Sequence, residues 1–395
     1  MDITIQPRKI KGSIDAIASK SHAHRVLICA AFADKPTQIY LNEISQDISA
    51  TIDCLTALSA SIVKTEYGYY VQPAESIPAA ATLPCAESGS TLRFMLPVVG
   101  ALGIDGTFKM EGRLPQRPLS PLKEEMERMG CIISRPVNDI LKCTGRLRAG
   151  AYHIDGSVSS QFITGLLLAC SLMEQPSSIN ILGRLESAPY VEITKQVLLS
   201  FGVDPEQLGT KKLTSPGNIQ IDGDWSNAAF WLSANLLGND VCVAHLNQGS
   251  AQGDRAIIDI LPQLETNTVI NCIDIPDLVP ILAVTAGALN GATFTGVRRL
   301  RLKESDRIEA VCNMIRSLGG KAEADEDTLK IYSAPYHGGI VDSCSDHRIA
   351  MAAAIASTVS ESPVTIFNAQ CVSKSYPMFW TDFAKLGGVY EQHIR

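Results

Sequence analysis

The 395-residue chain lacks most of the features that identify a protein class at once. Aromatic residues make up only 6% and the formal net charge is -7, so the chain does not offer the basic surface that general nucleic-acid binding needs. Its 11 cysteines are odd in number and include no CxxC pair, which argues against a disulfide framework and against zinc. We expect reduced, mostly buried thiols in a cytoplasmic protein.

Targeting segments and common catalytic motifs are missing as well. The N-terminus has neither a basic region nor an apolar region, so no signal peptide is predicted. The longest uncharged stretch, about residues 278–297, is broken by Pro280, Gly287, Asn290 and Gly291 and does not resemble a membrane span. The patterns GxGxxG, GxxxxGK[ST], HExxH and GxSxG do not occur, and the histidines are dispersed. We therefore expect no metal and no cofactor.

Periodicity over long distances is the informative feature. Apolar residues amount to 46% and charged residues to 19%, which is enough for a large core, and the length favours two domains. Six times a short polar turn precedes a run of small apolar residues. The turns are Ser19-Lys20-Ser21, Ser88-Gly89-Ser90, Ser157-Val158-Ser159, Ser226-Asn227, Pro276-Asp277 and Ser345-Asp346. The steps between them are 69, 69, 69, 51 and 68 residues. Ser and Asp cap helices well, and a helix that is apolar all round must be buried.

This repeat predicts an α/β protein of two domains, each with three units whose apolar helices lie inside surrounding sheets. We expect one discontinuous domain of residues 1–14 plus 218–395 and a second of residues 15–217, with crossings near 12–18 and 213–220. The linker signal is Ser215-Pro216-Gly217, and the strand at residues 2–6 is expected to pair with the second half. Shorter polar helices are predicted at 121–129 and 306–317, and a strand at 179–182.

Charged residues gather near the predicted helix starts. Each helix N-terminus carries about half a positive charge and unpaired N–H donors, so several aimed at one cleft would attract anions. The nearby cations are Lys20, Arg25, Arg93, Arg117, Lys303, Arg307, Arg348 and Lys374. Asp47, Asp277 and Glu304 lie among them and can act as bases, although Asp277 alone suits a helix cap and Glu304 an ion pair with Arg307. Ser159-Ser160-Gln161 suits a phosphate or sugar-like hydroxyls.

In this order and spacing the motifs resemble those of the 5-enolpyruvylshikimate-3-phosphate synthase family, over essentially the whole chain. The matching residues are Ser19-Lys20-Ser21 with Arg25, Ser88-Gly89-Ser90-Thr91-Leu92-Arg93, Arg117-Pro118-Leu119, Asp155 to Phe162, Ser187 with Pro189-Tyr190, Ile275-Pro276-Asp277, Lys303 to Arg307, Asp346-His347-Arg348 and Lys374-Ser375-Tyr376-Pro377. The resemblance implies two domains of three βαβαββ units each. It also implies transfer of the enolpyruvyl group of phosphoenolpyruvate to the 5-hydroxyl of shikimate 3-phosphate, with release of phosphate, on the pathway to chorismate and aromatic amino acids.

The family pattern also implies a role for each matching residue. Shikimate 3-phosphate would be held by Ser21, Arg25, Ser159, Ser160, Gln161, Ser187, Tyr190, Asp277 and Lys303. Phosphoenolpyruvate would be held by Lys20, Gly89, Arg117, Gln161, Arg307, Arg348 and Lys374. Asp277 would accept the proton of the attacking hydroxyl, while Glu304 and Lys20 would handle the proton at the methylene carbon. The reaction would pass through a tetrahedral ketal, closure of the two domains would exclude water, and the enzyme is expected to be a monomer.

This sequence departs from the family pattern at four positions. Glu87 stands where Asn is common, Ser90 where Thr is usual, Ala188 where Lys or Arg is usual, and Arg299 where some members have Asn. Gly89 is present, which by resemblance implies that glyphosate competes with phosphoenolpyruvate, but Glu87 leaves the strength of that competition open.

Two other functions compete with this one. A sister family transfers enolpyruvyl to UDP-N-acetylglucosamine and uses a catalytic Cys in the loop that here contains Arg113 to Arg117, but no Cys lies between Cys85 and Cys131. A non-catalytic anion-binding protein on the same scaffold would gain nothing from Asp277 and Glu304 in its cleft.

Overall fold

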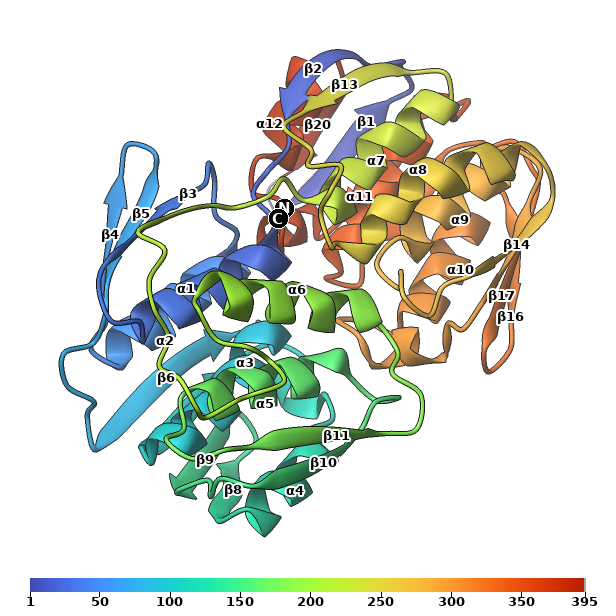
Figure 1. The fold of residues 1–395 in the computed structure, drawn as a ribbon. Helices are drawn as coiled ribbons and strands as arrows, with labels where there is room; N and C mark the ends of the chain where they lie inside the picture. Colours follow the sequence, from blue (N-terminus) through green and yellow to red (C-terminus); the bar gives the residue numbers. More distant parts are fainter. Residues whose placement is uncertain (394–395) are drawn as a thin grey trace. The chain divides into compact units, whose positions relative to one another are not determined.

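The computed structural model describes residues 1–393 and divides the chain into two compact units (Figure 1). Unit 1 combines Met1–Ile17 with the chain from Gly223 onward, and unit 2 is Ala18–Asp222. The chain therefore passes between the units at residues 17/18 and 222/223, whereas we expected the boundaries at 14/15 and 217/218. Each unit is described below by itself.

Unit 2 contains three separate sheets and six helices. Its helices are α1 (Lys20–Ala31), α2 (Gln46–Ala57), α3 (Gly89–Leu102), α4 (Leu122–Arg128), α5 (Ser160–Ser171) and α6 (Ala188–Ser200). Its strands are β3 (Thr37–Tyr40), β4 (Ser61–Thr65), β5 (Gly68–Gln72), β6 (Ala80–Ala86), β7 (Asp105–Met110), β8 (Cys131–Val137), β9 (Ile140–Gly145), β10 (Ala151–Asp155), β11 (Ser178–Leu182) and β12 (Asn218–Gln220). The sheet orders are β12-β3-β5-β4, β6-β7-β9-β8 and β10-β11.

Unit 1 repeats this plan. Its main helices are α7 (Trp225–Leu236), α8 (Ile257–Ile260), α9 (Val279–Ala288), α10 (Arg307–Ser317), α11 (His347–Ala356) and α12 (Phe379–Lys385). Its strands are β1 (Asp2–Gln6), β2 (Lys11–Asp15), β13 (Asp240–Ala244), β14 (Thr268–Asn271), β15 (Ala292–Thr295), β16 (Lys321–Ala324), β17 (Thr328–Tyr332), β18 (Gly339–Asp342), β19 (Val364–Phe367) and β20 (Val389–His393). The sheet orders are β18-β19-β1-β20, β14-β15-β17-β16 and β13-β2.

The βαβαββ repeat is complete in the segments β6–β9 and β14–β17. In each, a helix joins two parallel strands, a second helix follows, and an antiparallel hairpin completes the sheet. The segment β10-α5-β11-α6 is shorter, because residues 201–217 contain no strand. The predicted α/β architecture of two three-part domains is confirmed, and the sheets of residues 1–393 remain six separate sheets rather than one closed barrel. No described helix combines the length and the apolar character needed to cross a membrane.

The apolar helices lie inside, as their composition predicts. Ten residues of α11 and nine of the ten residues of α9 are buried, and α9 packs against both α7 and α11. In unit 2, α3 packs against α5, which in turn packs against α6 (Figure 1). The polar helix α10 instead buries one side only, as the alternating exposed and buried residues along it show.

The N-caps lie within four of the six predicted turns. Ser19 and Ser88 cap α1 and α3, with side chains that accept from the backbone N–H of His22 and Thr91. Ser159, in the turn 157–159, caps α5, and Asp346, in the turn 345–346, caps α11. The expectation for the fourth turn was wrong, because Ser226 lies within α7, and Asp224 provides the cap. Asp277 precedes α9 without capping it, which leaves its carboxylate available to side chains.

The all-round burial of α9 makes a stability prediction. Leu282→Ala should lower the free energy of unfolding of unit 1 by about 2–5 kcal/mol, because the fully buried side chain leaves a cavity. Leu199→Ala in α6, where the side chain is 57% exposed, is the matched control and should cost much less. Urea denaturation of both variants measures the difference. Equal losses would contradict the arrangement of helices inside sheets.

Candidate active site

The first cluster of predicted site residues lies at the N-terminal end of α1 in unit 2. Lys20 is the first residue of the helix, and its Nζ donates to Oδ2 of Asp47 at 2.7 Å. Asp47 stands in the first turn of α2, and the two side chains are 17% and 13% exposed. The carboxylate therefore holds the ammonium group beside a helix N-terminus, where an anion would be favoured.

Arg25 is buried and joins three helices of unit 2. Its guanidinium donates to two threonine hydroxyls and two backbone oxygens, namely Thr194 at 2.7 Å, Thr164 at 3.1 Å, Tyr190 at 2.8 Å and Ser21. The group also lies 4.9 Å from the centre of the Phe94 ring. Burial lowers the pKa of Arg25 to about 9. Four of its five N–H groups are thus used, so the clearest effect of Arg25 is to fix Ser21 and Tyr190 in place.

The N-terminal ends of α3 and α5 are tied together by Gln161. Its Nε2 donates to Oγ of Ser90 at 3.0 Å, and its Oε1 accepts from Nη1 of Arg93 at 3.0 Å. Arg93 also donates to the backbone oxygen of Pro118 at 3.0 Å, which anchors the loop after Arg117. Two helix N-termini with their polar side chains therefore meet within unit 2.

Gly89 gives two cations access to the start of α3. A Cβ atom at Gly89 would lie 2.4 Å from Nη1 of Arg117 and 2.7 Å from Nη1 of Arg93. Any larger residue would displace these guanidinium groups from the helix end. Nearby, the carboxyl group of Glu87 lies against Gly112, where an added Cβ would be 2.5 Å away. The departure at Glu87 thus places a carboxylate against the loop that leads to Arg117.

The three serines predicted to hold a phosphate occur at two further helix starts. Ser159 caps α5 by accepting from the N–H of Gln161 at 3.3 Å, and Ser160 begins the helix. Ser187 precedes Ala188, the first residue of α6, and is 3% exposed. Its backbone is left-handed, with φ 56°, a conformation that is uncommon for a non-glycine residue and costs energy. Because α5 packs against α6, these starts belong to one region of unit 2.

Unit 1 holds a second cluster whose centre is Arg307. The side chain is 1% exposed and forms salt bridges with three carboxylates, namely Asp277 at 2.9 Å, Glu304 at 2.6 Å and Asp346 at 2.9 Å. Asp346, which is fully buried, also accepts from Ser305 at 3.0 Å. The negative partners raise the pKa of Arg307 further, although burial alone would lower it. A buried charge is tolerable only with such compensation.

Asp277 is surrounded by cations. Its Oδ2 accepts from Nη2 of Arg348 at 2.7 Å, its Oδ1 from Arg307, and Nζ of Lys303 lies 3.9 Å away. Burial would raise the pKa of Asp277, but the three cations outweigh it and hold that pKa far below its usual range. The carboxylate is therefore ionised and, with these partners, is a weak base.

Lys303, unlike Asp277, has a pKa that is shifted toward neutral pH. Burial lowers its pKa to about 8, against the attraction of Asp277, and Arg307 contributes to the decrease. Arg299, four residues earlier, also lowers the pKa and donates from Nη2 to the backbone oxygen of Ile273 at 3.0 Å. Lys303 can thus change its charge near neutral pH, unlike the arginines around it.

Arg348 and Lys374 complete the second cluster at the N-terminal end of α11. The backbone N–H of Arg348 donates to Asp346 at 3.0 Å, while Nζ of Lys374 donates to the backbone oxygen of Ser345 at 3.1 Å. Cys344 and Ser345 both have positive φ angles, of 52° and 55°. In this strained turn the Ser345 oxygen accepts from Lys374, and the cap Asp346 accepts from the backbone of Arg348.

The predicted site residues therefore form two clusters, one in each unit. The cluster of unit 2 contains Lys20, Ser21, Arg25, Gly89, Arg117, Ser159, Ser160, Gln161, Ser187 and Tyr190. The cluster of unit 1 contains Asp277, Lys303, Glu304, Arg307, Arg348 and Lys374. Among residues 1–393, no group of three or more His, Cys, Asp or Glu side chains is placed to hold a metal ion.

Two participants in these clusters were not assigned from the sequence. The motif before Arg348 gives Asp346 no role, yet Asp346 is the buried partner of Arg307. Asp254, which stands between Gly253 and the apolar run of α8, is also buried, an unusual position for a carboxylate. The amino-acid composition alone does not show which acidic residues will be buried.

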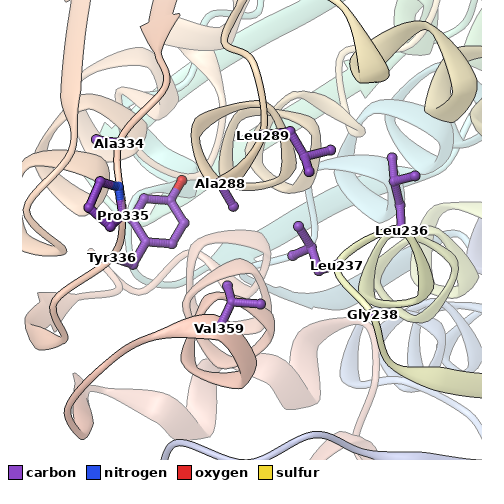
Figure 2. Close-up of a pocket in the computed structure, with 9 residues that line it drawn as sticks. All are labelled: Leu236, Leu237, Gly238, Ala288, Leu289, Ala334, Pro335, Tyr336 and Val359. Atoms are coloured by element: carbon purple, nitrogen blue, oxygen red, sulfur yellow. The ribbon is translucent and has the colours of Figure 1, made fainter.

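A cavity in unit 1 is unrelated to these clusters (Figure 2). It measures about 270 Å³ and is lined by Leu236, Leu237, Gly238, Ala288, Leu289, Ala334, Pro335, Tyr336 and Val359. Leu236 and Ala288 are the last residues of α7 and α9, so the cavity lies at helix C-termini. Those ends carry partial negative charge, and Nζ of Lys9 donates to the backbone oxygen of Leu237 there.

Known proteins match this chain over nearly its whole length. A family model described as EPSP synthase (3-phosphoshikimate 1-carboxyvinyltransferase) matches residues 5–383. Two curated relatives carry the name 3-phosphoshikimate 1-carboxyvinyltransferase. The relative from Clostridium kluyveri is 36% identical, with 99% of this chain and 98% of the relative covered. The relative from Clostridium acetobutylicum is 37% identical, with 98% and 97% covered.

Solved structures share the fold. The EPSP synthase from Acinetobacter baumannii aligns with a TM-score of 0.80 at 23% identity, covering 99% of this chain and all of the other. The enolpyruvyl transferase NikO from Streptomyces tendae aligns with a TM-score of 0.78 at 16% identity, with 99% and 98% covered.

The central position of Arg307 predicts a large effect of its removal. Arg307→Met should cost unit 1 about 3–5 kcal/mol of stability at pH 7, because three carboxylates lose their shared cation. The loss should shrink as the pH falls, because without Arg307 the pKa of Asp277 is higher and protonation relieves the repulsion. Arg301→Met is the control, since that side chain is 36% exposed and pairs only with Asp306 at 3.3 Å among the salt bridges found. Chemical denaturation measures the free energy of unfolding of both variants. An equal loss in the two would contradict the role of Arg307 as the shared partner of three carboxylates.

Proposed function

The chain belongs to the EPSP synthase family, and we propose how its two clusters carry out the reaction of that family. The chain is a transferase that moves the enolpyruvyl group of phosphoenolpyruvate to shikimate 3-phosphate in the shikimate pathway, which supplies the aromatic amino acids. The assignment of residues to substrates rests on the match of each residue to the family motifs. The observation that best supports it is the set of three cations around the ionised Asp277.

We assign shikimate 3-phosphate mainly to unit 2. Ser159, Ser160 and Ser187 are hydroxyl groups at helix starts, and such groups together with backbone N–H donors suit a phosphate. Ser21 and Arg25 suit the carboxylate side, with Tyr190 and Gln161 nearby. From unit 1, Lys303 would contribute charge to the phosphate and Asp277 would contact the 5-hydroxyl.

Phosphoenolpyruvate is assigned to the arginines and lysines at the helix starts. In unit 2 these are Lys20 and Arg117, with Gly89 and Gln161 at the end of α3. In unit 1 they are Arg307, Arg348 and Lys374. Guanidinium groups bind carboxylates and phosphates through paired hydrogen bonds, which suits a substrate that has both. Because each substrate is assigned residues of both units, turnover requires the two clusters to act on one substrate pair.

The reaction then needs one base and one acid. The 5-hydroxyl oxygen attacks C2 of phosphoenolpyruvate while Asp277 takes the hydroxyl proton. A proton passes to the methylene carbon by way of Lys20, whose ammonium group carries one, and Glu304. The product of this addition is a tetrahedral ketal. Loss of a proton from the new methyl group then expels phosphate and restores the double bond. The cations stabilise the phosphate as it leaves, and no other group is required by this balance.

The low pKa of Asp277 is compatible with these reaction steps only if the bound substrates change the surroundings of Asp277. Arg348 and Lys303 help to keep that pKa low, and both are assigned to substrate anions. When a phosphate or carboxylate neutralises them, the pKa of Asp277 rises toward that of an effective base. The site therefore gains its base only after it has bound both partners.

The choice of acceptor substrate distinguishes this function from the sister reaction and from a non-catalytic binding protein. Phosphate release should be measured with phosphoenolpyruvate and either shikimate 3-phosphate or UDP-N-acetylglucosamine as acceptor. Release with the first acceptor alone supports the proposal, while release with the second alone would indicate the sister reaction. No release with either, at high protein concentration, would support a binding protein. Adding glyphosate tests the expected competition with phosphoenolpyruvate at Gly89.

We also propose that the enzyme acts as a monomer in the cytoplasm. Nine of the eleven cysteines are buried free thiols, which suits a reducing compartment. Sedimentation of the purified protein, with and without substrates, measures its mass in solution and so tests whether it is a monomer.

Asp277→Asn should lower kcat by about 10²–10⁴-fold while shikimate 3-phosphate still binds, because the amide keeps the shape but cannot accept a proton. Steady-state assays and a binding titration measure the two effects. Asp274→Asn, three residues earlier and exposed, is the control and should behave as the native enzyme. Near-native turnover of the Asp277 variant would remove the residue from the role of base.

Lys303 makes the activity dependent on pH. With a pKa of about 8 it is charged below that pH and neutral above it, so kcat/KM for shikimate 3-phosphate should fall as the pH rises beyond 8. The decline should approach tenfold per pH unit, since one proton is lost. Lys303→Arg keeps its charge and should move the decline to higher pH. A profile that stays flat to pH 10, or the same decline in both proteins, would contradict the assignment.

A further inference from the structure

Four buried polar side chains form a hydrogen-bonded chain near the starts of α1, α2 and α3 in unit 2. Nδ1 of His24 lies 2.7 Å from Oγ1 of Thr51, which in turn lies 2.7 Å from Oγ1 of Thr91. The hydroxyl of Thr91 donates to Oγ of Ser88 at 2.8 Å. All four side chains are fully buried, and at such positions polar groups are retained only when they are hydrogen-bonded. The mechanism above gives this chain no role.

The chain lies one helical turn away from a pair of predicted site residues. His24 stands four residues after Lys20 in α1, and Thr51 stands four residues after Asp47 in α2. Residues four apart share one face of a helix. The bond between His24 and Thr51 is therefore a second link between α1 and α2, one turn beyond their salt bridge at the helix starts.

The other end of the chain holds the start of α3. Ser88 caps this helix and directly precedes Gly89, which is assigned to phosphoenolpyruvate. The hydroxyl of Thr91 also lies 3.3 Å from the backbone oxygen of Asp47, so α2 and α3 are joined close to both of their starts. The chain thus connects the three helix ends near which the substrate anion is proposed to bind.

The positions of the protons follow from what each group can donate. Thr91 has one hydroxyl proton, which goes to Ser88 or to the backbone oxygen of α2, so Thr91 accepts from Thr51. The proton of Thr51 is then used, and Nδ1 of His24 carries the proton that it donates to Thr51.

His24 is uncharged in this arrangement. Burial, followed by the charges of Lys20 and Arg25, holds the pKa of its imidazole well below the usual range. Its Nε2 is buried and has no hydrogen-bond partner within residues 1–393, so a proton there would be an unpaired buried donor. His24 is therefore a fixed donor at the end of the chain.

We propose that this chain positions the starts of α1, α2 and α3 for phosphoenolpyruvate, with His24, Thr51 and Thr91 as positioning residues. It aligns Lys20 with the turn at Gly89, because groups that bind a substrate must be held to within about half an ångström. The inference rests on the function proposed above. Shikimate 3-phosphate is assigned in unit 2 to groups that other hydrogen bonds hold, at the start of α5 and around Arg25.

Thr51→Val keeps the shape of the side chain and removes the central hydroxyl. With saturating shikimate 3-phosphate, kcat/KM for phosphoenolpyruvate should fall by about five- to tenfold, because the partners of the hydroxyl are left unpaired in the core. The dissociation constant of shikimate 3-phosphate should be nearly unchanged, whereas a general loosening of unit 2 would weaken both substrates. Thr51→Ser keeps the hydroxyl and should recover most of the loss.

Two further variants complete the experiment. Thr285→Val in α9 is the matched control, because Thr285 is also fully buried and donates to the backbone oxygen of Ile281 at 2.8 Å. It should leave the kinetics with phosphoenolpyruvate native. Thr91→Val removes the next link, and the double variant with Thr51→Val should lose little more than either single variant, because the chain acts as one unit.

Native kinetics in Thr51→Val, equal losses for both substrates, or no recovery in Thr51→Ser would overturn the proposal. If Thr51→Val does not fold, the same measurements on Thr91→Val decide.

The protonation of His24 gives a readout that needs no turnover. Nitrogen-15 NMR of enzyme labelled at histidine should show a neutral ring with its proton on Nδ1, in a signal that His24→Asn removes. A charged ring at pH 7, or a proton on Nε2, would overturn the proposed chain. If the native enzyme releases no phosphate from phosphoenolpyruvate and shikimate 3-phosphate, the proposed function itself has failed. Native turnover with unmoved kinetics in the variants would reject only the positioning role.

Discussion

The salt bridges of the buried Arg307 with Asp277, Glu304 and Asp346 are the interaction on which the arrangement of unit 1 depends. Burying one guanidinium and several carboxylates is costly, and the cost is offset only because the groups compensate one another. The same bonds fix the start of α10 relative to the starts of α9 and α11. The cations proposed to bind substrate are thus held in place by carboxylates before any substrate arrives, and the anions of the substrate compete with those carboxylates.

The two units use different chemistry at their helix starts. Unit 2 combines hydroxyls, an amide and backbone groups with the cations Lys20 and Arg117, and its Arg25 lies buried among Thr164 and Thr194. Unit 1 relies on full charges, and among them Lys303 can change its protonation near neutral pH. Neutral donors suit recognition of a fixed phosphate, whereas coupled charges suit proton transfer. In this account unit 2 contributes mainly to binding, and unit 1 contributes the base.

Much of the fold follows from the sequence, because a helix apolar on all sides has only one stable environment. The repeat therefore predicted α3, α9 and α11 as interior helices, and the cap at Ser88 followed from its side chain. The cap of α7 was misplaced because Asp224 and Ser226 are both good caps, and only the backbone distinguishes them. The spacing of three residues indicated Glu304 as a partner of Arg307. Asp277 and Asp346 were out of reach, since they lie 30 and 39 positions from Arg307 and only the folded chain brings them together. Family motifs indicated which residues matter, but not which carboxylate pairs with which cation.

The most direct test of the central claim is a crystal structure of the native enzyme with shikimate 3-phosphate and inorganic phosphate bound. The account predicts a phosphate on Lys303 and an anion on Arg348, with the bond between Arg348 and Asp277 lengthened and Asp277 within hydrogen-bonding distance of the 5-hydroxyl. Arg307 should keep its bond to Asp346. Both anions bound away from these cations, with every carboxylate contact of Arg348 and Arg307 unchanged, would contradict the account.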